Sequence, residues 1–500
     1  MSGARPAADT GELDPVVSTR TLFLAVFPSI VLPMFMAALD QTIVATALPA
    51  IAAQMGDVER ISWVVVSYLV ATTIAAPVYG KLGDVLGRRR MMLAALFLFI
   101  VASVLCAVAP TILTLTLARV LQGLGGGGLL TLSQALIGES VPARERGKFQ
   151  GYLSTTFVTA ATFGPVVGGY LTQHFGWQSV FLVNVPLGII ALALALRLPA
   201  NPGGGRLQFD VWGVVLFSAF ITPALLALEK AQRFNVAALP VVAVLLSIAA
   251  IALTLLLKQE RRAPSPLLPL NLLRQPAIWR TNTMAALLAG AMVASVSFLP
   301  MYYQVVRGAS PAEVGLLLLP MTAGVGMGAM FTGRMIALTG RTTLFPCIGL
   351  VVTSGTLLTL ALFAPRFDLH TLPWLFGLVS LSMGTGMPVV QMTVQSVAGP
   401  KLLGSASASV QFSRSVGAAF GTAIVGAVLF ALLAAQDADT AGRFAELVEQ
   451  GPRVLAELSP ERRGVVTTEI AWAFQGAFLT MAAFVLGALG LAWWIPVRRI

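Results

Sequence analysis

Long uninterrupted apolar stretches run through this chain, and they constrain its fold more than any other feature. A helix needs roughly 17 to 25 apolar residues to cross a bilayer, and fourteen stretches reach that length. Charged residues make up only 11% of the 500 positions and gather in short clusters between the stretches. Lipid can cover this apolar surface, whereas a soluble core cannot. We therefore expect an all-α polytopic membrane protein with transmembrane helices near 22–47, 61–79, 91–109, 111–137, 149–172, 180–198, 211–229, 237–257, 280–304, 312–339, 344–364, 372–398, 404–434 and 471–495.

The basic residues predict how the chain is oriented. Most of the 32 lysines and arginines fall on one set of alternate loops, which is typical of the cytoplasmic side. Every predicted inner loop carries at least one of them, which supports an even number of helices. We therefore expect a multi-pass protein of the inner (plasma) membrane with both termini in the cytoplasm. The polar segment 1–21 predicts a cytoplasmic tail and a retained first helix rather than a signal peptide.

Composition also excludes several classes of function. The net charge of +11 does not indicate nucleic-acid binding, because the basic residues lie at helix ends. Cys106 and Cys347 are too few for a disulfide framework or a zinc site. A GxGxxG sequence lies inside an apolar span with no strand before it, so it does not indicate dinucleotide binding: Gly123, Gly125 and Gly128. No nucleotide-binding GxxxxGK[ST] motif and no cluster of metal ligands or nucleophiles is found, so we expect neither enzyme, metal nor cofactor.

One predicted outer segment is much longer than the other loops. Residues 435–470 hold seven acidic and four basic residues. Two short helices are expected within it, around 444–448 and 454–458. We interpret the segment as a solvated loop, and a docking site for a periplasmic adaptor is the alternative.

Two loops of similar sequence indicate an internal repeat. GKLGDVLGRRR at 80–90 and GRMIALTGRTT at 333–343 share a glycine, a basic residue and a later Gly-Arg pair. Repeated halves around a central cavity are typical of secondary transporters. We expect six-helix bundles at 22–198 and 280–500, with two additional transmembrane helices in a linker at 199–279.

Several motifs in combination resemble the major facilitator superfamily, specifically its fourteen-helix drug:proton antiporter group. GKLGDVLGRRR is similar to the superfamily's signature loop, and LDQTIVATALP at 39–49 and RVLQGLGGG from Arg119 are similar to motifs of the group. FLVNVPLG at 181–188, RGASPAEVGLLLLP at 307–320 and the segment from Arg414 are similar to family patterns too. GPVVGG resembles the antiporter motif: Gly164, Pro165, Gly168 and Gly169. The resemblance implies the fold expected above and exchange of substrate for protons. Close packing of small residues against the other half would explain these glycines equally well.

Asp40 is the only acidic residue deep within a predicted span. An ionised carboxylate there costs several kcal/mol unless it faces a cavity or a partner. At 1.5 Å per residue, Asp40 lies about 10 Å and Arg119 about 12 Å below the outer boundary. Burial favours the protonated acid and a nearby guanidinium favours the carboxylate, so movement of the partner can switch the site. The resemblance also implicates both positions in proton and substrate binding. We expect Asp40 and Arg119 to couple transport to protons, and a purely structural ion pair is the alternative.

The signature loop is expected to act as a conformational latch. Glycines permit close backbone approach, and Asp84 suits the N-terminus of a helix, with 404–407 in the other half as its candidate partner. Arg88 is expected to pair with Glu139. The latch comprises Gly80, Gly83, Asp84, Gly87, Arg88 and Glu139.

Polar, aromatic and methionine side chains within the spans are candidates for a substrate cavity, although ordinary packing would explain each of them. Arg414 lies near mid-bilayer, where carbonyls or Gln391, Gln395 and Gln411 are its expected partners. The candidates are Tyr68, Gln134, Asn184, Asn282, Met383, Met387, Gln391, Gln395, Gln411 and Arg414.

These observations predict a proton-coupled exporter of lipophilic compounds. A single deep carboxylate can neutralise one positive charge, so we expect monocationic or neutral substrates in addition to protons. The alternatives are an exporter of a specific metabolite or lipid on the same scaffold and, from another class, a membrane receptor or interaction protein without transport.

Overall fold

The computed structural model describes residues 26–56, 60–142, 145–199, 209–231, 239–450 and 458–496, and helices account for nearly all of them. The expected tail at 1–21 lies outside these ranges, as does nearly all of the short helix expected at 454–458. Each of the fourteen predicted stretches is occupied by a helix or a pair of consecutive helices. Within the described residues, twelve helices are long and apolar enough to cross a membrane. The stretches outside this set are α6 (Arg146–Phe175), which is rich in threonine and glycine, and the shorter pair α7–α8.

The first half is a bundle of helices with short connections. Thr111 begins α5 with a capping box, in which its hydroxyl accepts from the Thr114 amide at 3.2 Å. Gly87 has a φ of 95°, a conformation that favours glycine, and it lets the chain turn directly from α3 into α4. The elements are α2 (Phe27–Met55), α3 (Ile61–Leu86), α4 (Arg88–Ala107), α5 (Ile112–Ser140), α6, α7 (Ser179–Leu182) and α8 (Asn184–Ala195).

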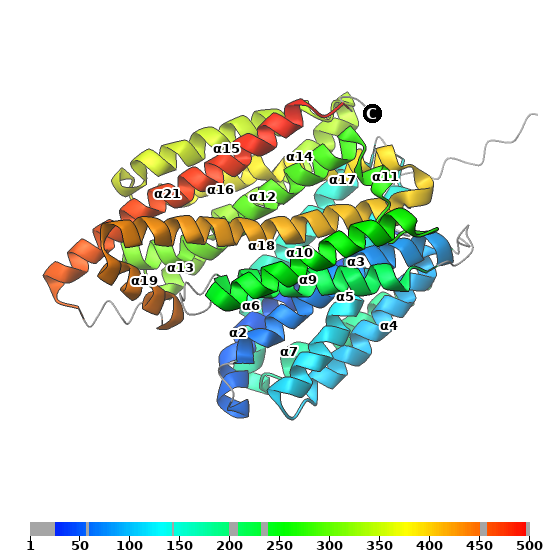
Figure 1. The fold of residues 1–500 in the computed structure, drawn as a ribbon, viewed down its shortest axis with the longest axis horizontal. Coiled ribbons are helices and arrows are strands. Elements are labelled where there is room, and N and C mark those ends of the chain that lie inside the picture. The colour runs from blue at the N-terminus through cyan, green and yellow to red at the C-terminus, as the bar shows by residue number, and fades with distance from the viewer. Residues whose placement is uncertain are drawn as a thin grey trace, which may run out of the picture.

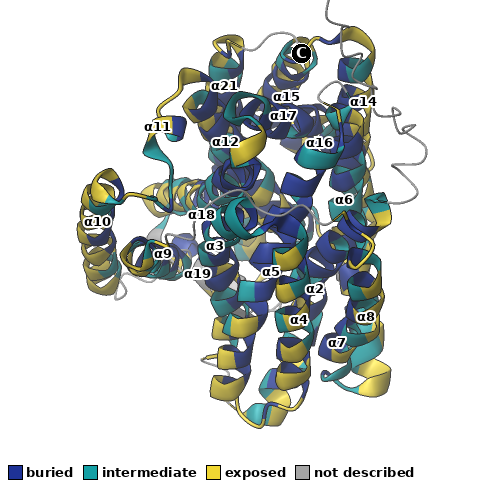
Figure 2. Ribbon diagram, turned by 90° about the vertical axis from the view of Figure 1, so that its right-hand side faces the viewer, coloured by how far each residue is buried: buried dark blue, intermediate teal, exposed yellow. Residues whose placement is uncertain are grey.

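Two helices lie between the halves in sequence and beside the bundle in space. α9 (Val211–Ala231) packs against α3 of the first half and α18 of the second, and α10 (Leu239–Arg262) packs against α9. Phe217 of α9 and Phe412 of α18 have ring centroids 5.4 Å apart. Most of α10 is exposed (Figure 2), and its apolar side chains suit contact with lipid. The short helix α11 (Leu270–Leu273) leads into the second half.

The second half repeats the bundle with more interruptions. Its elements are α12 (Pro276–Met301), the π-helix η3 (Tyr302–Val306), α13 (Pro311–Leu317), α14 (Leu319–Thr339), α15 (Leu344–Phe363), the 3₁₀ turn η4 (Ala364–Arg366), α16 (Leu372–Gly384), α17 (Gly386–Ala398), the 3₁₀ turn η5 (Pro400–Leu402), α18 (Leu403–Gln436), α19 (Ala438–Gln450) and α21 (Pro460–Trp493).

The segment 435–470 differs from the expected solvated loop, because its described residues are mostly helical. α18 extends to Gln436, α19 covers the short helix expected at 444–448, and α21 begins at Pro460 rather than near residue 471. Phe444 of α19 is buried in the apolar core of the second half. Arg462 donates to Asp437 at 2.5 Å and to Asp439 at 2.9 Å, which ties α19 to α21.

The halves meet along two seams, where α6 packs on α14 and α3 packs on α18. At one seam, a Cβ on Gly333 would overlap the carbonyl oxygen of Gly147, and at the other a Cβ on Gly404 would overlap that of Gly80. These backbones therefore approach as only glycine allows. The two halves spread apart toward the left of Figure 1, opposite the C-terminus. These glycine contacts lie nearer the face of the molecule that holds the C-terminus, so the two halves are closed against each other at that face.

Candidate functional site

A buried ion pair joins the middle of α2 to α5. Arg119 Nη1 donates to Asp40 Oδ2 at 2.5 Å, and the two side chains are 1% and 0% exposed. The structure therefore brings together the two charges that the sequence placed at similar depth. Because both groups are removed from water, each depends on the other for its stability as an ion.

Two amides complete the hydrogen bonding of this carboxylate. Gln122 Nε2 and Asn184 Nδ2 each donate to Asp40 Oδ1 at 2.9 Å. Gln122 also accepts from Arg119 at 2.7 Å and donates to Ser103 Oγ at 2.8 Å. The network draws on α2, α4, α5 and α8, so a change in the charge of Asp40 would reach four helices of the first half.

The guanidinium is held on its other side by α3. Arg119 Nε donates to the carbonyl of Val64 at 3.1 Å, and its Cζ lies 4.1 Å from the ring centroid of Tyr68, a cation–π contact. The Tyr68 hydroxyl donates to the carbonyl of Ala37 at 3.2 Å. Tyr68 and Asn184, which were expected to line the substrate cavity, thus belong to the ion-pair network.

Sequence reasoning missed Gln122 and Ser103. Gln122 follows Arg119 by three positions in the RVLQG motif, and residues three apart share a helix face, so the sequence carried a signal for it. Ser103 comes from α4 and is buried in an apolar stretch. Only its tertiary contact reveals that it belongs to the network.

At the opposite end of α3, the signature loop contacts the second half. Asp84 accepts from the backbone amides of Gly404 and Ser405, at 2.8 and 2.9 Å, at the N-terminus of α18. A carboxylate is stabilised there by the helix dipole and by free amide groups. Arg88 donates to Asp84 at 2.7 Å and to Glu139 at 2.5 Å. The expected latch residues are therefore assembled into one cluster that links the halves.

The glycines of this loop serve separate purposes. Gly80 provides the close approach to α18, and Gly87 provides the left-handed turn between α3 and α4. Gly83 lies against α5, because a Cβ there would come within 2.7 Å of Leu132 Cδ2. Only Gly80 thus contacts the other half directly.

Four of the expected cavity residues line one small cavity between the halves, of about 30 Å³. Gln150 and Ser154 of α6 add further polar groups to its wall. A cavity of this size has room for about one water molecule, so a larger substrate requires the halves to move. The four expected residues are Gln134, Met387, Gln391 and Arg414.

The remaining candidates lie elsewhere. Asn282 donates to Ser409 Oγ at 3.1 Å, and Gln395 donates to the carbonyl of Gln134 at 2.8 Å, so both make hydrogen bonds between helices. Met383 is buried in the core of the second half, and Gln411 is absent from the cavity wall. In this conformation none of these four residues lines the cavity between the halves.

Arg414 lacks the partners expected for it. Gln391 donates instead to Ser407 at 2.8 Å, and Gln395 is engaged as described above. Within the described residues, Arg414 has neither an ion pair nor a hydrogen bond, and its nearest aromatic contact is the ring of Phe157 at 5.9 Å. The cavity between the halves therefore carries an uncompensated positive charge.

The glycines of the antiporter motif pack within the first half, not against the second. A Cβ on Gly164 would overlap Thr42 of α2, and one on Gly168 would overlap Thr46, whereas Gly169 faces open space. Gly164 and Gly168 are four residues apart and so share one face of α6, on either side of the turn that contains Pro165. This face lies on α2 just beyond Asp40, because the Thr42 hydroxyl donates to the Ala160 carbonyl at 3.0 Å.

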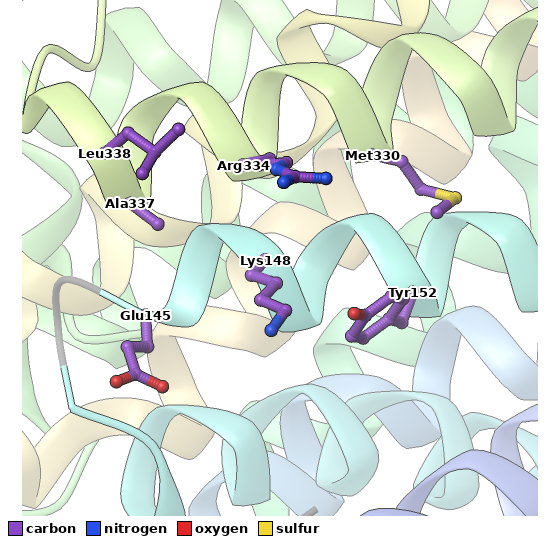
Figure 3. Close-up of a pocket in the computed structure, with 7 residues that line it drawn as sticks. All are labelled: Glu145, Lys148, Tyr152, Met330, Arg334, Ala337 and Leu338. Carbon is purple, nitrogen blue, oxygen red and sulfur yellow. The ribbon is translucent and has the colours of Figure 1, made fainter. Parts of the chain in front are cut away.

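A larger cavity of about 660 Å³ lies between α6 and α14. Figure 3 shows the side chains around it, with Lys148 and Tyr152 on α6 and Arg334 on α14. Lys148 and Arg334 are exposed and belong to the basic residues that predicted the cytoplasmic face. Its walls contain no buried acid, so this cavity does not add to the ion-pair site.

Comparisons with known proteins agree with this geometry. A family model described as Major Facilitator Superfamily matches residues 30–422. An uncharacterised MFS-type transporter of Mycobacterium tuberculosis (strain H37Rv) is 33% identical over 476 residues, which cover 93% of this chain and 69% of that protein. The multidrug transporter protein MdtP of Bacillus subtilis (strain 168) is 30% identical over 413 residues, 82% of this chain and 76% of that protein. The crystal structure of the human organic anion transporter MFSD10 shares the fold, with a TM-score of 0.63 at 14% identity over 93% of this chain and 99% of that one.

Proposed function

The chain belongs to the major facilitator superfamily, and from this premise we propose that it is a proton-coupled exporter of the fourteen-helix drug:proton antiporter group. It is a multi-span membrane transporter of small molecules rather than an enzyme. Multidrug transporters are among its relatives at about 30% identity. Beyond membership of the superfamily, we propose that the protein exports its substrate, that the coupling ion is the proton and that the chain belongs to the fourteen-helix group. We also propose that it lies in the inner membrane with both termini in the cytoplasm.

The single observation that carries the proposal is the ion pair of Asp40 and Arg119 in the middle of the first half. The other acidic residues of the described membrane helices lie nearer to helix ends. Asp40 is therefore the group on which a proton would change charge deep within the membrane. Ionisable residues at such depth are usually functional, because hydrocarbon makes them costly to keep.

The network supplies a way to couple protonation to movement. A proton on Asp40 would neutralise the carboxylate that holds Arg119, and two amide donors on Oδ1 would lose part of their charge-assisted bonding. The first half would then be free to rearrange about α2 and α6. Loss of the proton restores the pair. Movement of this kind would open the cavity around Gln391 and close it again.

The latch would set which face of the membrane is closed. Asp84 ties the signature loop to α18 of the other half, so this contact must break before the halves separate at that face. We assign it to stabilising the conformation that is closed toward the cytoplasm.

The charges near the cavity limit how many positive charges a substrate can carry. α14 contains no acidic residue, and Glu313 on the preceding turn is engaged by Ser310 in a helix cap at 2.8 Å. Arg414 adds a positive charge that has no ion pair within the described residues, and this charge disfavours substrates that carry several positive charges. A second desolvated positive charge on a substrate would remain uncompensated at several kcal/mol. We therefore assign neutral or monocationic lipophilic compounds.

The test uses purified protein in proteoliposomes with an imposed pH gradient and a monocationic lipophilic dye. Asp40→Asn keeps the shape of the side chain but removes its proton exchange, so we expect a folded protein without uphill dye transport. Glu313→Gln, at an exposed acid, is the matched control and should transport like the wild type. Wild-type uphill transport by the Asp40→Asn protein would contradict the proposal.

A further inference from the structure

A cavity of about 520 Å³ lies between α3, α5 and α9, separate from the cavity between the halves. This volume is within the range of small-molecule sites, about 300 to 1,000 Å³. One of its three walls is α9, the first of the two inserted helices. Figure 2 shows α9 and α10 beside the bundle, next to α3. The cavity is therefore at the periphery of the helices, where membrane lipid has access.

Two of the polar residues that line this cavity, on α3 and α5, lie toward one end of it. α3 begins at Ile61 and α5 at Ile112, so Ser67 and Thr116 lie only about 9 and 6 Å from the beginnings of their helices at 1.5 Å per residue. Trp63, which is 51% exposed, lines the same end. Tryptophan is enriched where hydrocarbon meets the polar headgroups. This end of the cavity thus lies close to one surface of the membrane.

The rest of the wall is nearly all apolar. Ile74 of α3 and Leu124 of α5 lie about 20 and 18 Å from the same helix ends. Ser218 and Thr222 are the polar exceptions on α9. The Ser218 hydroxyl donates to the Val214 carbonyl of its own helix at 2.8 Å. A ligand that matches this wall has a polar group near the membrane surface and a long apolar part below it.

Two hydroxyl groups of this wall have no hydrogen-bond partner within the described part of the chain. These are Ser67 Oγ and Thr116 Oγ1, and both atoms are buried. Thr116 as a residue is only 8% exposed. A hydroxyl on a helix ordinarily donates to a carbonyl of the preceding turn, as Ser218 does. Buried polar groups left unpaired are costly, so a hydrogen-bond acceptor that reached either hydroxyl from the cavity would be stabilised there.

We propose that this cavity binds the acyl chain of a membrane phospholipid, with the ester carbonyl accepting hydrogen bonds from Ser67 and Thr116. Ester carbonyls lie at the boundary between headgroups and hydrocarbon, and the acyl chain extends from there toward the centre of the bilayer. This order matches the polar end and the apolar wall. In the orientation proposed above, the lipid belongs to the outer leaflet. The site is independent of proton coupling.

The bound lipid would fill the space between the first half and α9. Because α9 also packs on α18, the lipid supports a helix that spans the seam between the halves. The inserted helices would then be attached to the first half partly through lipid. This attachment tolerates movement of α3 during transport better than a close-packed protein interface.

Native mass spectrometry of the purified full-length protein in detergent tests the proposal by measuring lipid binding. Two phosphatidylethanolamines of equal chain length are compared. One is the diacyl lipid, and the other is the dialkyl ether, which lacks the carbonyls. The wild type should retain one diacyl lipid about tenfold more tightly than the ether, the effect of two ordinary hydrogen bonds. Ser67→Ala/Thr116→Val should bind both lipids equally, whereas Ser218→Ala should behave like the wild type.

A second variant keeps the test independent of the hydroxyls. Ile74→Trp fills the apolar end and should abolish retention of both lipids without unfolding the protein, as checked by its melting temperature. Equal binding of the two lipids by the wild type, or an unchanged preference in the double variant, would overturn the proposal. It would equally fail if an exported dye displaced the lipid and the double variant lost dye binding, since the cavity would then be a substrate site. None of these results depends on whether Asp40 carries a proton.

Discussion

Each half of the molecule holds an arginine within the membrane, and the surroundings of the two arginines differ. Arg119 in the first half is paired with Asp40, hydrogen-bonded by Gln122 and covered by the ring of Tyr68. Arg414 in the second half faces a cavity and, among the described residues, has only a distant aromatic contact. The first is a charge neutralised by a titratable partner. The second is a fixed charge with free donors.

This difference suggests a division of work between the halves. A site whose charge can change suits proton exchange, whereas a fixed charge with unused donors suits recognition of an acceptor on a substrate. The sequence already separated the two arginines, because it offered Arg119 an acid at similar depth and offered Arg414 only carbonyls and glutamines. The predictions that follow test the comparison in order of expected effect.

The largest effect should follow from removing the paired arginine. Arg119→Ala leaves Asp40 buried without its counter-charge, and breaking a buried pair costs about 3–5 kcal/mol of stability. Arg414→Ala removes a charge without a partner and should cost less than about 1 kcal/mol. Thermal unfolding in detergent would measure both.

A control separates the lost partner from lost packing. Asp40→Leu with Arg119→Met replaces both charges with apolar groups and should recover most of the stability, although transport is lost. Equal destabilisation by the two alanine variants would show that the arginines do not differ in the way described.

A smaller effect should come from the latch. Its carboxylate, on Asp84, accepts from backbone amides of α18 as well as from Arg88. Asp84→Asn keeps an acceptor oxygen but turns charge-assisted hydrogen bonds to α18, each worth about 1.5–3 kcal/mol, into neutral ones worth about 0.5–1.5 kcal/mol. The closed conformation should therefore be less populated and the exchange rate altered, while dye affinity stays within about twofold, since the loop is far from the cavity. Spin labels on α6 and α14 would report the population. If dye binding and transport fall together, the loop is not a latch.

The smallest effect concerns an ion pair that is exposed to water. The pKa of Asp437 is lowered, chiefly because the Arg462 side chain donates to its carboxylate. A depressed folded-state pKa adds stability above the unfolded value of about 3.9, and this stability is lost as the pH falls through the folded value. We expect the protection of the α19 amides against hydrogen exchange, corrected for the intrinsic pH dependence of exchange, to fall below about pH 4, while the helices of the Asp40 network stay protected. In Arg462→Gln, exchange should already be fast at pH 6. If the protection of the α19 amides, corrected for the intrinsic pH dependence of exchange, is the same at pH 3 and pH 6 in the wild type, the contact does not hold the helix.

The sequence predicted most of the helices and the central pair because hydrocarbon allows few alternatives. An acid and an arginine at equal depth need a partner, and Asp40 and Arg119 had only each other. The predictions that differ from the structure are those that depend on which neighbouring helix a side chain faces. Asn184 turns toward Asp40, and the glycines of α6 turn toward α2, although helical spacing alone allows several neighbours. α19 was predicted as a short helix within a solvated loop, because its one apolar face finds a partner only in the folded bundle.

Proton release on substrate binding tests the central claim most directly. If a proton and a monocation compete for the carboxylate of Asp40, binding of one dye cation should release about one proton, as charge balance at a single site requires. Titration of weakly buffered protein in detergent, followed by a pH indicator and by calorimetry in two buffers, would count the protons. We predict about one proton per cation for the wild type and none for Asp40→Asn. Equal proton release by both proteins would show that another group carries the proton.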